Sequence, residues 1–355
     1  MGTMAIHPAA RCRSETAIRM VKVTFRENPC IDMEEDVMEQ QIMQPQTNAG
    51  AAQEQRHPIA IEAIDLVKDY GHGENAVHAL RGVNVRFEQG RFTAIMGPSG
   101  SGKSTTLMEI MNLMKPEDGR IVVLGHDLAE LKKKAERKAL RKDLQIIFQD
   151  PMSSLDPRMP IYDVLAEPLK VHKWSKEKIN RRIGELMELV GLNPDYVDRF
   201  PAQFSGGQRQ RISIARALAT DPKVLLLDEP IASLDVSIQA GIINLLEDLQ
   251  NKLGVAYLFV AHNLSVVRHI SSRVAVMYLG QIVELGPRQS VFNQPQHPYT
   301  QRLLASVPVA DPENRQPRRF DDSEIPSPLR KVGETVTKPR YRQVAPQHWV
   351  ADGIA

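Results

Sequence analysis

Apolar and polar side chains alternate along the chain from residue 59 onward, after a long polar stretch. The segment Ile-Ala-Ile-Glu-Ala-Ile at 59–64 has the two-residue period of a β-strand, and Val83, Val85 and Phe87 repeat that period. Residues 92–96 instead form a short, continuous apolar run that leads into a glycine-rich turn. The pattern predicts antiparallel strands followed by one buried strand.

Two stretches have the periodicity of helices. One, Ser104–Met114, follows the glycine-rich turn directly. The other, Lys176–Val190, carries apolar side chains on one face, with Ser175 as the expected N-cap and Gly191 as the expected stop. A helical subdomain is therefore predicted between about residues 150 and 205.

Two further apolar runs, Val224–Leu227 and Ala256–Val260, alternate with helical segments. Short apolar strands separated by helices are typical of a parallel sheet that helices cover on both faces. The sequence therefore predicts an α/β core, preceded by an antiparallel β subdomain and interrupted by a helical insertion.

The two ends of the chain lack such patterns. Residues 1–58 are polar and end in a Gln/Asn/Ala-rich run, so we expect them to be mostly disordered, and internal methionines such as Met43 are candidate translation starts. Proline and charge rise again from Pro308, which predicts a loosely packed tail. We expect one ordered domain over residues 59–290 and a C-terminal extension over residues 291–355.

Composition excludes several classes of protein without naming a function. Hydrophobic residues make up 42% and charged residues 25% of the chain, and the net charge of +2 gives no overall field for nucleic acid or an anionic membrane. The apolar stretches fall short of the roughly 18 residues of a membrane span, and no apolar secretory segment follows the first arginines, so we expect a cytoplasmic location. Only Cys12 and Cys30 occur, which disfavours a disulfide scaffold, a zinc site or an iron–sulfur cluster.

The glycine-rich turn fits the pattern G-x-x-x-x-G-K-[ST] between a predicted strand and a predicted helix, the context that this motif requires. Its backbone N–H groups can surround a phosphate, and the helix N-terminus adds a favourable dipole. Lys103 would reach the β- and γ-phosphates and Ser104 would ligate Mg²⁺, whereas a chance glycine-rich turn is the alternative. The predicted ATP contacts are Gly97, Pro98, Ser99, Gly100, Ser101, Gly102, Lys103, Ser104 and Thr105.

Two carboxylates, Asp228 and Glu229, follow the apolar run that ends at Leu227. They are thus expected at the carboxyl end of a buried strand, where α/β sheets bind ligands. Asp228 would hold Mg²⁺ through water, and Glu229 would polarise the attacking water as a general base. Two solvated acids can end a strand without forming a site, but the phosphate loop favours the catalytic interpretation.

The segment Phe204-Ser-Gly-Gly-Gln-Arg-Gln-Arg211 resembles the signature motif of the ABC ATPase superfamily. Ser205 and the amides of Gly206 and Gly207 can form a second anion nest at a helix N-terminus. The resemblance implies that these residues and Gln208 contact the ATP of a second ATPase subunit, so that two subunits close head to tail around two nucleotides.

Other motifs stand in the order usual for this superfamily. Gln149 resembles the Q-loop glutamine, His262 the switch histidine and Asp235 the nucleotide-contacting D-loop aspartate. The resemblance implies catalytic roles for Gln149 and His262 beside the general base, and makes Gln149 a further Mg²⁺ ligand. Tyr70 resembles the aromatic residue that stacks on adenine, although an aromatic beside a turn glycine also packs for ordinary reasons.

Three segments are similar to the oligopeptide and dipeptide importer ATPases: Phe148–Met159, Ala166–Leu169 and His297–Leu304. The resemblance extends over about residues 59–329. It implies a subunit on the cytoplasmic face of the plasma membrane that powers import of peptides or related small solutes. Its implied partners are two membrane permeases, a second identical or paralogous ATPase subunit and, indirectly, a solute-binding protein. The solute itself is not encoded in these motifs.

Three features depart from the importer pattern. Pro98 and residues 70–81 look more like lipoprotein-release and macrolide-efflux ATPases, which keeps an export function as the alternative. Ile231-Ala-Ser-Leu-Asp235 replaces the usual Thr-Ser-Ala-Leu-Asp, so the D-loop serine is shifted. Ile325–Leu329 is present, but the cysteine-rich iron–sulfur motif that follows it in many relatives is missing.

Residues 132–142 hold a run of seven lysines and arginines. A patch for nucleic acid or lipid headgroups is one interpretation. Glu130, Glu136 and Asp143 are interleaved with the run and no stacking aromatics accompany it, which favours a solvated helix face. Soluble ABC ATPases that act on DNA or ribosomes typically carry tandem domains, coiled coils or zinc hooks, so we expect no nucleic-acid partner.

Overall fold

The computed structural model describes residues 57–71, 77–150, 154–306 and 339–352. Most of the predicted disordered segment, both cysteines and the segment Ile325–Leu329 lie outside the described residues. None of the described helices is both long and apolar enough to cross a membrane.

A four-stranded antiparallel sheet is built from the first alternating segments. Its order is β2-β1-β4-β5, with β1 at Ile59–Tyr70, β2 at Val77–Glu88, β4 at Asp118–Val123 and β5 at His126–Asp127. The alternation places Val83, Val85 and Phe87 in the core, as the two-residue period predicts. The predicted antiparallel subdomain is thus present.

An eight-stranded sheet holds the continuous apolar runs, in the order β11-β12-β10-β9-β3-β8-β7-β6. Five adjacent strands, β9-β3-β8-β7-β6, are parallel, and β3, β7 and β8 are buried along their whole length. The strands span Phe92–Met96 (β3), Leu144–Ile147 (β6), Val224–Asp228 (β7), Ala256–Val260 (β8), Arg273–Tyr278 (β9), Gln281–Pro287 (β10), Arg340–Ala345 (β11) and His348–Asp352 (β12).

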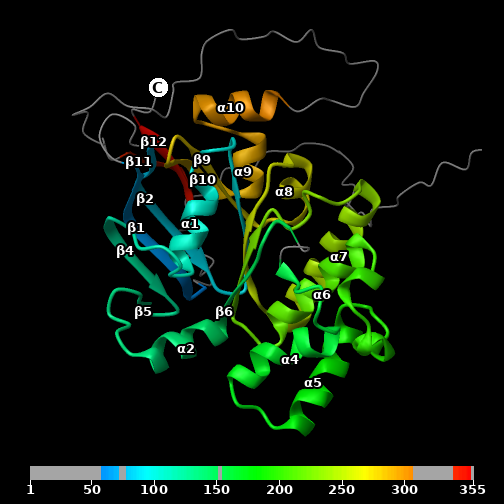
Figure 1. The fold of residues 1–355 in the computed structure, drawn as a ribbon. Coiled ribbons are helices and arrows are strands. Elements are labelled where there is room, and N and C mark those ends of the chain that lie inside the picture. The colour runs from blue at the N-terminus through cyan, green and yellow to red at the C-terminus, as the bar shows by residue number, and fades with distance from the viewer. Residues whose placement is uncertain (1–56, 72–76, 151–153, 307–338, 353–355) are drawn as a thin grey trace, which may run out of the picture. The chain divides into compact units, whose positions relative to one another are not determined.

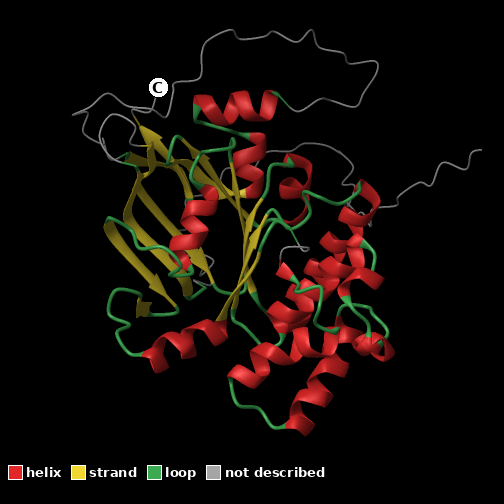
Figure 2. Cartoon of the chain, viewed as in Figure 1, coloured by secondary structure: helices red, strands yellow, loops and turns green. Residues whose placement is uncertain are grey.

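Helices cover both faces of this sheet (Figures 1 and 2). Helix α1 (Lys103–Ile110) packs between the two sheets, where Leu107 and Ile110 join one core cluster. The opposite face is covered by α6 (Gly206–Leu218), α7 (Val236–Leu253) and α8 (Leu264–Ile270), and α4 (Ile161–Val171) and α5 (Lys176–Leu189) pack on α6. The remaining helices are α2 (Lys134–Asp143), α9 (Arg288–Asn293), α10 (Pro298–Ala305) and the 3₁₀ turns Pro194–Asp198 and Pro201–Gln203.

The ends of the two predicted helices follow local chemistry. In α5 the Ser175 side chain accepts a hydrogen bond from the Lys178 N–H, and Gly191 adopts φ 70° just beyond the helix, as predicted. Helix α1 ends at Ile110, four residues before the predicted Met114. The reason is Asn112, whose left-handed φ of 54° breaks the helical path.

The expected loose tail is wrong for residues 340–352, which form a β-hairpin on the edge of the large sheet. Strand β12 pairs with β10, and its His348 Nε2 lies 2.7 Å from the buried Glu284 Oε1. The Tyr341 hydroxyl donates to the Ile282 carbonyl. These partners are about 60 residues away in sequence, so local composition did not predict the pairing.

Candidate functional site

The turn between β3 and α1 needs glycine because other backbone lies against it. A Cβ atom on Gly97 would lie 2.0 Å from the Met277 carbonyl oxygen, and one on Gly102 would lie 2.5 Å from the Ala79 carbonyl oxygen. Gly102 also has a left-handed φ of 97°. The turn is therefore held in one shape by β2 and β9, and Ser99 and Gly100 at its tip are exposed.

Lys103 lies folded over this turn. Its ammonium donates hydrogen bonds to the carbonyls of Gly97 at 3.0 Å and Pro98 at 2.7 Å. Burial lowers the pKa of Lys103, while the nearby Glu229 and Asp228 carboxylates raise it. The buried cation is thus placed inside the loop that the sequence predicts to surround phosphates.

Ser104 and Asp228 meet across 124 residues of sequence. The Ser104 hydroxyl donates to Asp228 Oδ1 at 3.0 Å, which joins the start of α1 to the end of β7. Burial raises the pKa of Asp228, and the hydrogen bond from Ser104 opposes that rise. A hydroxyl and a carboxylate oxygen are hard donors of the kind that Mg²⁺ prefers, with remaining positions for water and phosphate oxygens. The described residues contain no cluster of three or more acidic, histidine or cysteine ligands that would suit a metal bound by protein alone.

Glu229 and His262 form a close pair at the ends of neighbouring strands. His262 Nε2 lies 2.5 Å from Glu229 Oε1, and the Glu229 N–H donates to the Val260 carbonyl at 3.0 Å. Glu229 has a left-handed φ of 48°, a strained conformation for a residue with a side chain. The imidazole is placed to donate a hydrogen bond to the carboxylate and fix its direction.

Tyr70 lies at the end of β1, and the residue is 39% exposed. The Tyr70 hydroxyl donates to Met114 Sδ at 3.2 Å, and Lys68 Nζ lies 5.9 Å from the ring centroid. Lys68 also donates to the Lys115 carbonyl and pairs with Glu117. The loop after α1 therefore holds the aromatic ring, a contact that the sequence did not indicate.

Tyr70→Ala is expected to raise the KM for ATP about tenfold and to change kcat little. The reason is that stacking of an aromatic side chain on a base is worth roughly 1–3 kcal/mol and acts on binding. Steady-state kinetics with ATP would check this, with Tyr70→Phe as the matched control because it keeps the ring. Equal KM values for Tyr70→Ala and the native chain would show that adenine stacks elsewhere.

The signature segment begins α6 as a capping box. Ser205 Oγ accepts from the Gln208 N–H at 3.3 Å, and Gln208 Oε1 accepts from the Ser205 N–H at 2.9 Å. Gly207 packs against α7, since a Cβ there would lie 2.6 Å from Ile238 Cγ2. Among the described residues no hydrogen bond or ion pair joins Ser205, Gly206 or Gln208 to the phosphate loop. Ser205 itself is exposed.

Gln149 and Asp235 are also separate from the bonded cluster. Gln149 is exposed just after β6, and Asp235 is exposed at the N-cap of α7, where its side chain makes no capping bond. The D-loop between Ile231 and Leu234 is held by Gln239, whose amide donates to both of their carbonyls. Ser233, the shifted serine, is exposed.

Five predicted residues thus form one connected site: Lys103, Ser104, Asp228, Glu229 and His262. They come from the carboxyl ends of β3, β7 and β8, where a parallel sheet binds its ligands. Thr105, next along α1, is half-buried. The site thus combines a loop that can bind phosphates, two oxygen ligands for a hard metal ion (Ser104 and Asp228), and the Glu229 carboxylate oriented by the His262 imidazole.

Two protein-family models match the chain. The family described as ABC transporter matches residues 80–232, and the one described as Oligopeptide/dipeptide transporter, C-terminal region, matches residues 283–331. The second match includes the segments His297–Leu304 and Ile325–Leu329. The two matches confirm the resemblances inferred from the sequence.

Curated proteins with similar sequences are transport or import ATP-binding proteins by name. The chain is 51% identical over 265 residues to the Oligopeptide transport ATP-binding protein OppD of Mycobacterium tuberculosis, covering 72% of this chain and 43% of OppD. It is 48% identical over 277 residues to the Glutathione import ATP-binding protein GsiA of Salmonella typhimurium, covering 78% of this chain and 44% of GsiA. The chain therefore spans less than half the length of these relatives.

Solved structures share the fold. The ATP-binding cassette MJ0796, solved as a dimer with ADP and Pi, has a TM-score of 0.58 and 31% identity, with 64% of this chain and 98% of that chain covered. The protein cbiO1 of Clostridium perfringens, described as part of the transporter complex cbiONQ, has a TM-score of 0.61 and 29% identity, with coverage of 67% and 92%. These similarities confirm the predicted α/β class with its antiparallel sheet and helices.

Proposed function

Because the chain belongs to the ABC transporter ATPase family, we propose that it binds and hydrolyses ATP to power import of peptides or related small solutes. The observation that carries this proposal is the group of Lys103, Ser104, Asp228, Glu229 and His262, in which Ser104 donates to Asp228, His262 contacts Glu229 and both carboxylates act electrostatically on Lys103. The C-terminal match to the oligopeptide and dipeptide transporter region supports the import direction and the class of solute.

ATP would bind with its phosphates in the turn between β3 and α1. The backbone N–H groups of residues 99–105 would donate hydrogen bonds to the phosphates, and the Lys103 ammonium would neutralise part of the charge on the β- and γ-phosphates. Tyr70 would stack on the base. Ser104, Asp228 and, as the resemblance implies, Gln149 would hold Mg²⁺, which when bound neutralises charge that develops on the phosphate oxygens. Lys103 would leave its loop carbonyls to reach the phosphates.

Glu229 would act as the general base for the attacking water. Its strained backbone aims the carboxylate out of β7, and His262 holds that carboxylate by a hydrogen bond. The carboxylate polarises the water and takes its proton as the water oxygen attacks the γ-phosphorus. The bond between the γ-phosphorus and the bridging oxygen of the β-phosphate breaks, so ADP leaves and phosphate is released.

The signature residues would complete the site of a second ATPase subunit. Ser205, Gly206, Gly207 and Gln208 form a helix N-terminus at which Ser205 is exposed, and within the described residues they form no bond to their own chain's phosphate loop. Such an N-terminus suits a γ-phosphate bound to a partner, and Asp235 at the start of α7 lies on the same packed pair of helices. Two chains, identical or paralogous, would close head to tail around two ATP molecules.

The helical subdomain would pass the nucleotide state to two membrane permeases. Gln149 lies between β6 and the helical segment, so a change at the γ-phosphate can move α4 and α5 relative to the sheet. A pocket of about 340 Å³ between β6, α4 and α6 offers the permeases a place to bind.

The subunit would then be peripheral to the cytoplasmic face of the plasma membrane, and a solute-binding protein would act on the outer side of the membrane. We divide the chain into an ATPase domain at 59–290 and an extension at 291–355.

Transport assays with the assembled complex test this function. The chain and its permeases, reconstituted in vesicles with ATP on the side of the ATPase, should move labelled peptides toward that side. Lys103→Ala should abolish this movement because ATP binding is lost. Peptide movement in the opposite direction would favour the export alternative, and a chain that is isolated from native membranes with no permease bound would contradict a transport function.

A further inference from the structure

One face of the protein concentrates positive charge. Helix α2 with the segment before it (residues 130–143) carries seven lysines and arginines against three carboxylates, and the α4–α5 turn (170–178) adds four lysines against one carboxylate. The whole chain carries only +2. We call the surface formed by these two segments the basic face.

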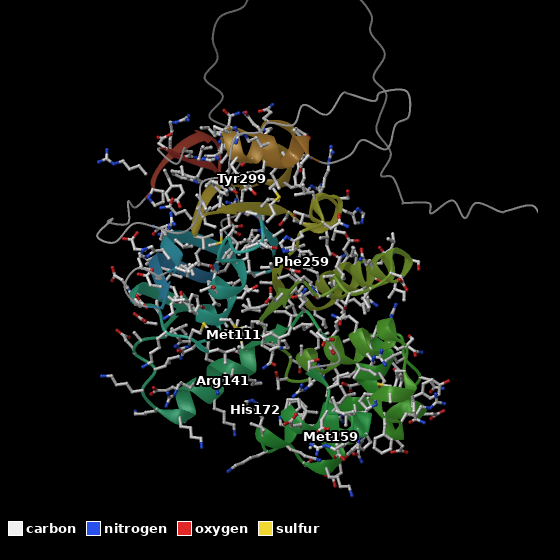
Figure 3. All side chains as sticks on the ribbon, turned by 45° about the horizontal axis from the view of Figure 1, so that its top comes forward. Met111, Arg141, Met159, His172, Phe259 and Tyr299 are labelled. Carbon is white, nitrogen blue, oxygen red and sulfur yellow. The ribbon has the colours of Figure 1, made fainter. Side chains whose placement is uncertain are left out.

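The two segments lie next to each other although about 30 residues separate them. The Lys138 ammonium donates to the Val171 carbonyl at the end of α4. Arg141 and His172 line the same pocket, and Figure 3 shows them as neighbours. Burial lowers the pKa of His172, and the charges of Lys138 and Lys142 lower it further, so the positive field of α2 reaches the turn.

Most cations of the basic face are not neutralised by the protein. Within the described residues, no ion pair is formed by Lys132, Lys134, Arg141, Lys142, Lys173 or Lys176. Val171, in the middle of these cations, is 55% exposed. An apolar side chain surrounded by unpaired lysines suits a surface with an anionic outer layer, which the lysines contact, and an apolar layer directly beneath it, which the apolar side chain can reach.

We propose that the basic face binds the surface of an anionic lipid membrane, with its lysines and arginines against the headgroups and Val171 at their level. Figure 1 places α2, α4 and α5 at one end of the fold and α10 with the β-hairpin at the other. The same end holds the pocket proposed for the permeases, so membrane contact and permease contact are compatible. This inference goes beyond ATP hydrolysis and does not depend on it.

Nucleic acid fits this face less well. Single-stranded binding needs aromatic rings on which bases stack. The aromatic ring of the α4–α5 turn, Trp174, is half-buried and covered by Lys178, whose Nζ lies 3.7 Å from the ring centroid. A diffuse set of exposed lysines without a free ring matches headgroups better than bases.

Vesicle co-sedimentation tests the proposal with the full chain and no nucleotide. The chain should bind vesicles of phosphatidylglycerol and phosphatidylcholine and should not bind vesicles of phosphatidylcholine alone. Lys134→Gln with Lys142→Gln should weaken this binding about 30-fold, because each cation near an anionic surface contributes roughly fivefold. Raising the salt to about 0.5 M should also weaken it, since mobile ions screen these charges.

The matched control removes the same charge elsewhere. Lys252→Gln with Arg342→Gln alters exposed cations on α7 and β11 and should leave vesicle binding within about twofold. Equal loss of vesicle binding in the two double variants would mean that overall charge, not this face, is responsible.

No binding of the native chain to anionic vesicles would overturn the proposal. The proposal would also be overturned if the Lys134→Gln, Lys142→Gln variant bound vesicles normally but no longer assembled with the permeases. The basic face would then bind a protein partner and not the membrane. ATP turnover of both double variants should remain native, which separates failure here from failure of the proposed enzyme activity.

Discussion

Glu229→Gln is expected to lower the rate of ATP hydrolysis by about 10²–10⁴-fold, the usual contribution of a positioned general base, while ATP still binds. The amide keeps the size of the carboxyl group and can still accept a hydrogen bond from His262, which lies 2.5 Å from the carboxylate oxygen. It cannot take a proton from water. Lys103, Ser104 and Asp228, which hold the phosphates and Mg²⁺ in the proposed mechanism, are unchanged.

Turnover and thermal stabilisation by ATP, measured on the same samples, separate chemistry from binding. ATP at about a hundredfold excess over its dissociation constant should stabilise the Glu229→Gln chain by about 2.7 kcal/mol through linkage. Unhydrolysed ATP should also keep two subunits together as a closed dimer. If the isolated subunit is monomeric, this dimer is measured in the assembled transporter. Lys103→Ala is the complementary variant, because it should lose the stabilisation itself. Near-native turnover of Glu229→Gln would remove Glu229 from the mechanism and make His262 the residue to test next.

The parts of the site that the sequence predicted are those encoded by contiguous motifs. Residues 97–105 indicate a phosphate loop because they match G-x-x-x-x-G-K-[ST] between an apolar strand and a helix. Asp228 and Glu229 follow an apolar run whose burial forces them to the end of a strand. In both cases the chemistry and the local backbone are set by neighbouring residues.

The parts that the sequence did not predict depend on contacts between distant segments. The 2.5 Å approach of His262 to Glu229 needs β7 and β8 to pair in register, and the contact of Tyr70 with Met114 needs the loop after α1 to return to β1. The C-terminal hairpin was missed because its anchor is Glu284, buried on a strand far from it in sequence. Turn and strand propensities depend on the local sequence, so they do not identify such distant partners.

A second variant with a large expected effect concerns stability. Glu109 on α1 is completely buried, and among the described residues neither of its carboxyl oxygens has a hydrogen-bond partner. Burial raises the pKa of Glu109 to about 7, with Lys68 opposing and Glu117 adding to the rise. The unfolded chain therefore releases this proton near pH 4.5, whereas the folded chain keeps it until about pH 7. As the pH rises through that window the folded state loses stability, by about 3 kcal/mol in total.

Glu109→Met should remove this loss, because methionine is unbranched, apolar and of similar length. The gain in the free energy of unfolding should be about 3 kcal/mol larger at pH 8 than at pH 4.5, since only the ionised glutamate carries the full cost of burial. Denaturant unfolding of the native and variant chains at the two pH values measures the difference. Glu117→Gln is the control, as it alters an exposed carboxylate paired with Lys68 and should change stability by less than about 1 kcal/mol. The same gain for Glu109→Met at both pH values would show that Glu109 does not titrate between them in the folded protein, and its buried carboxyl group would then be stabilised by a partner.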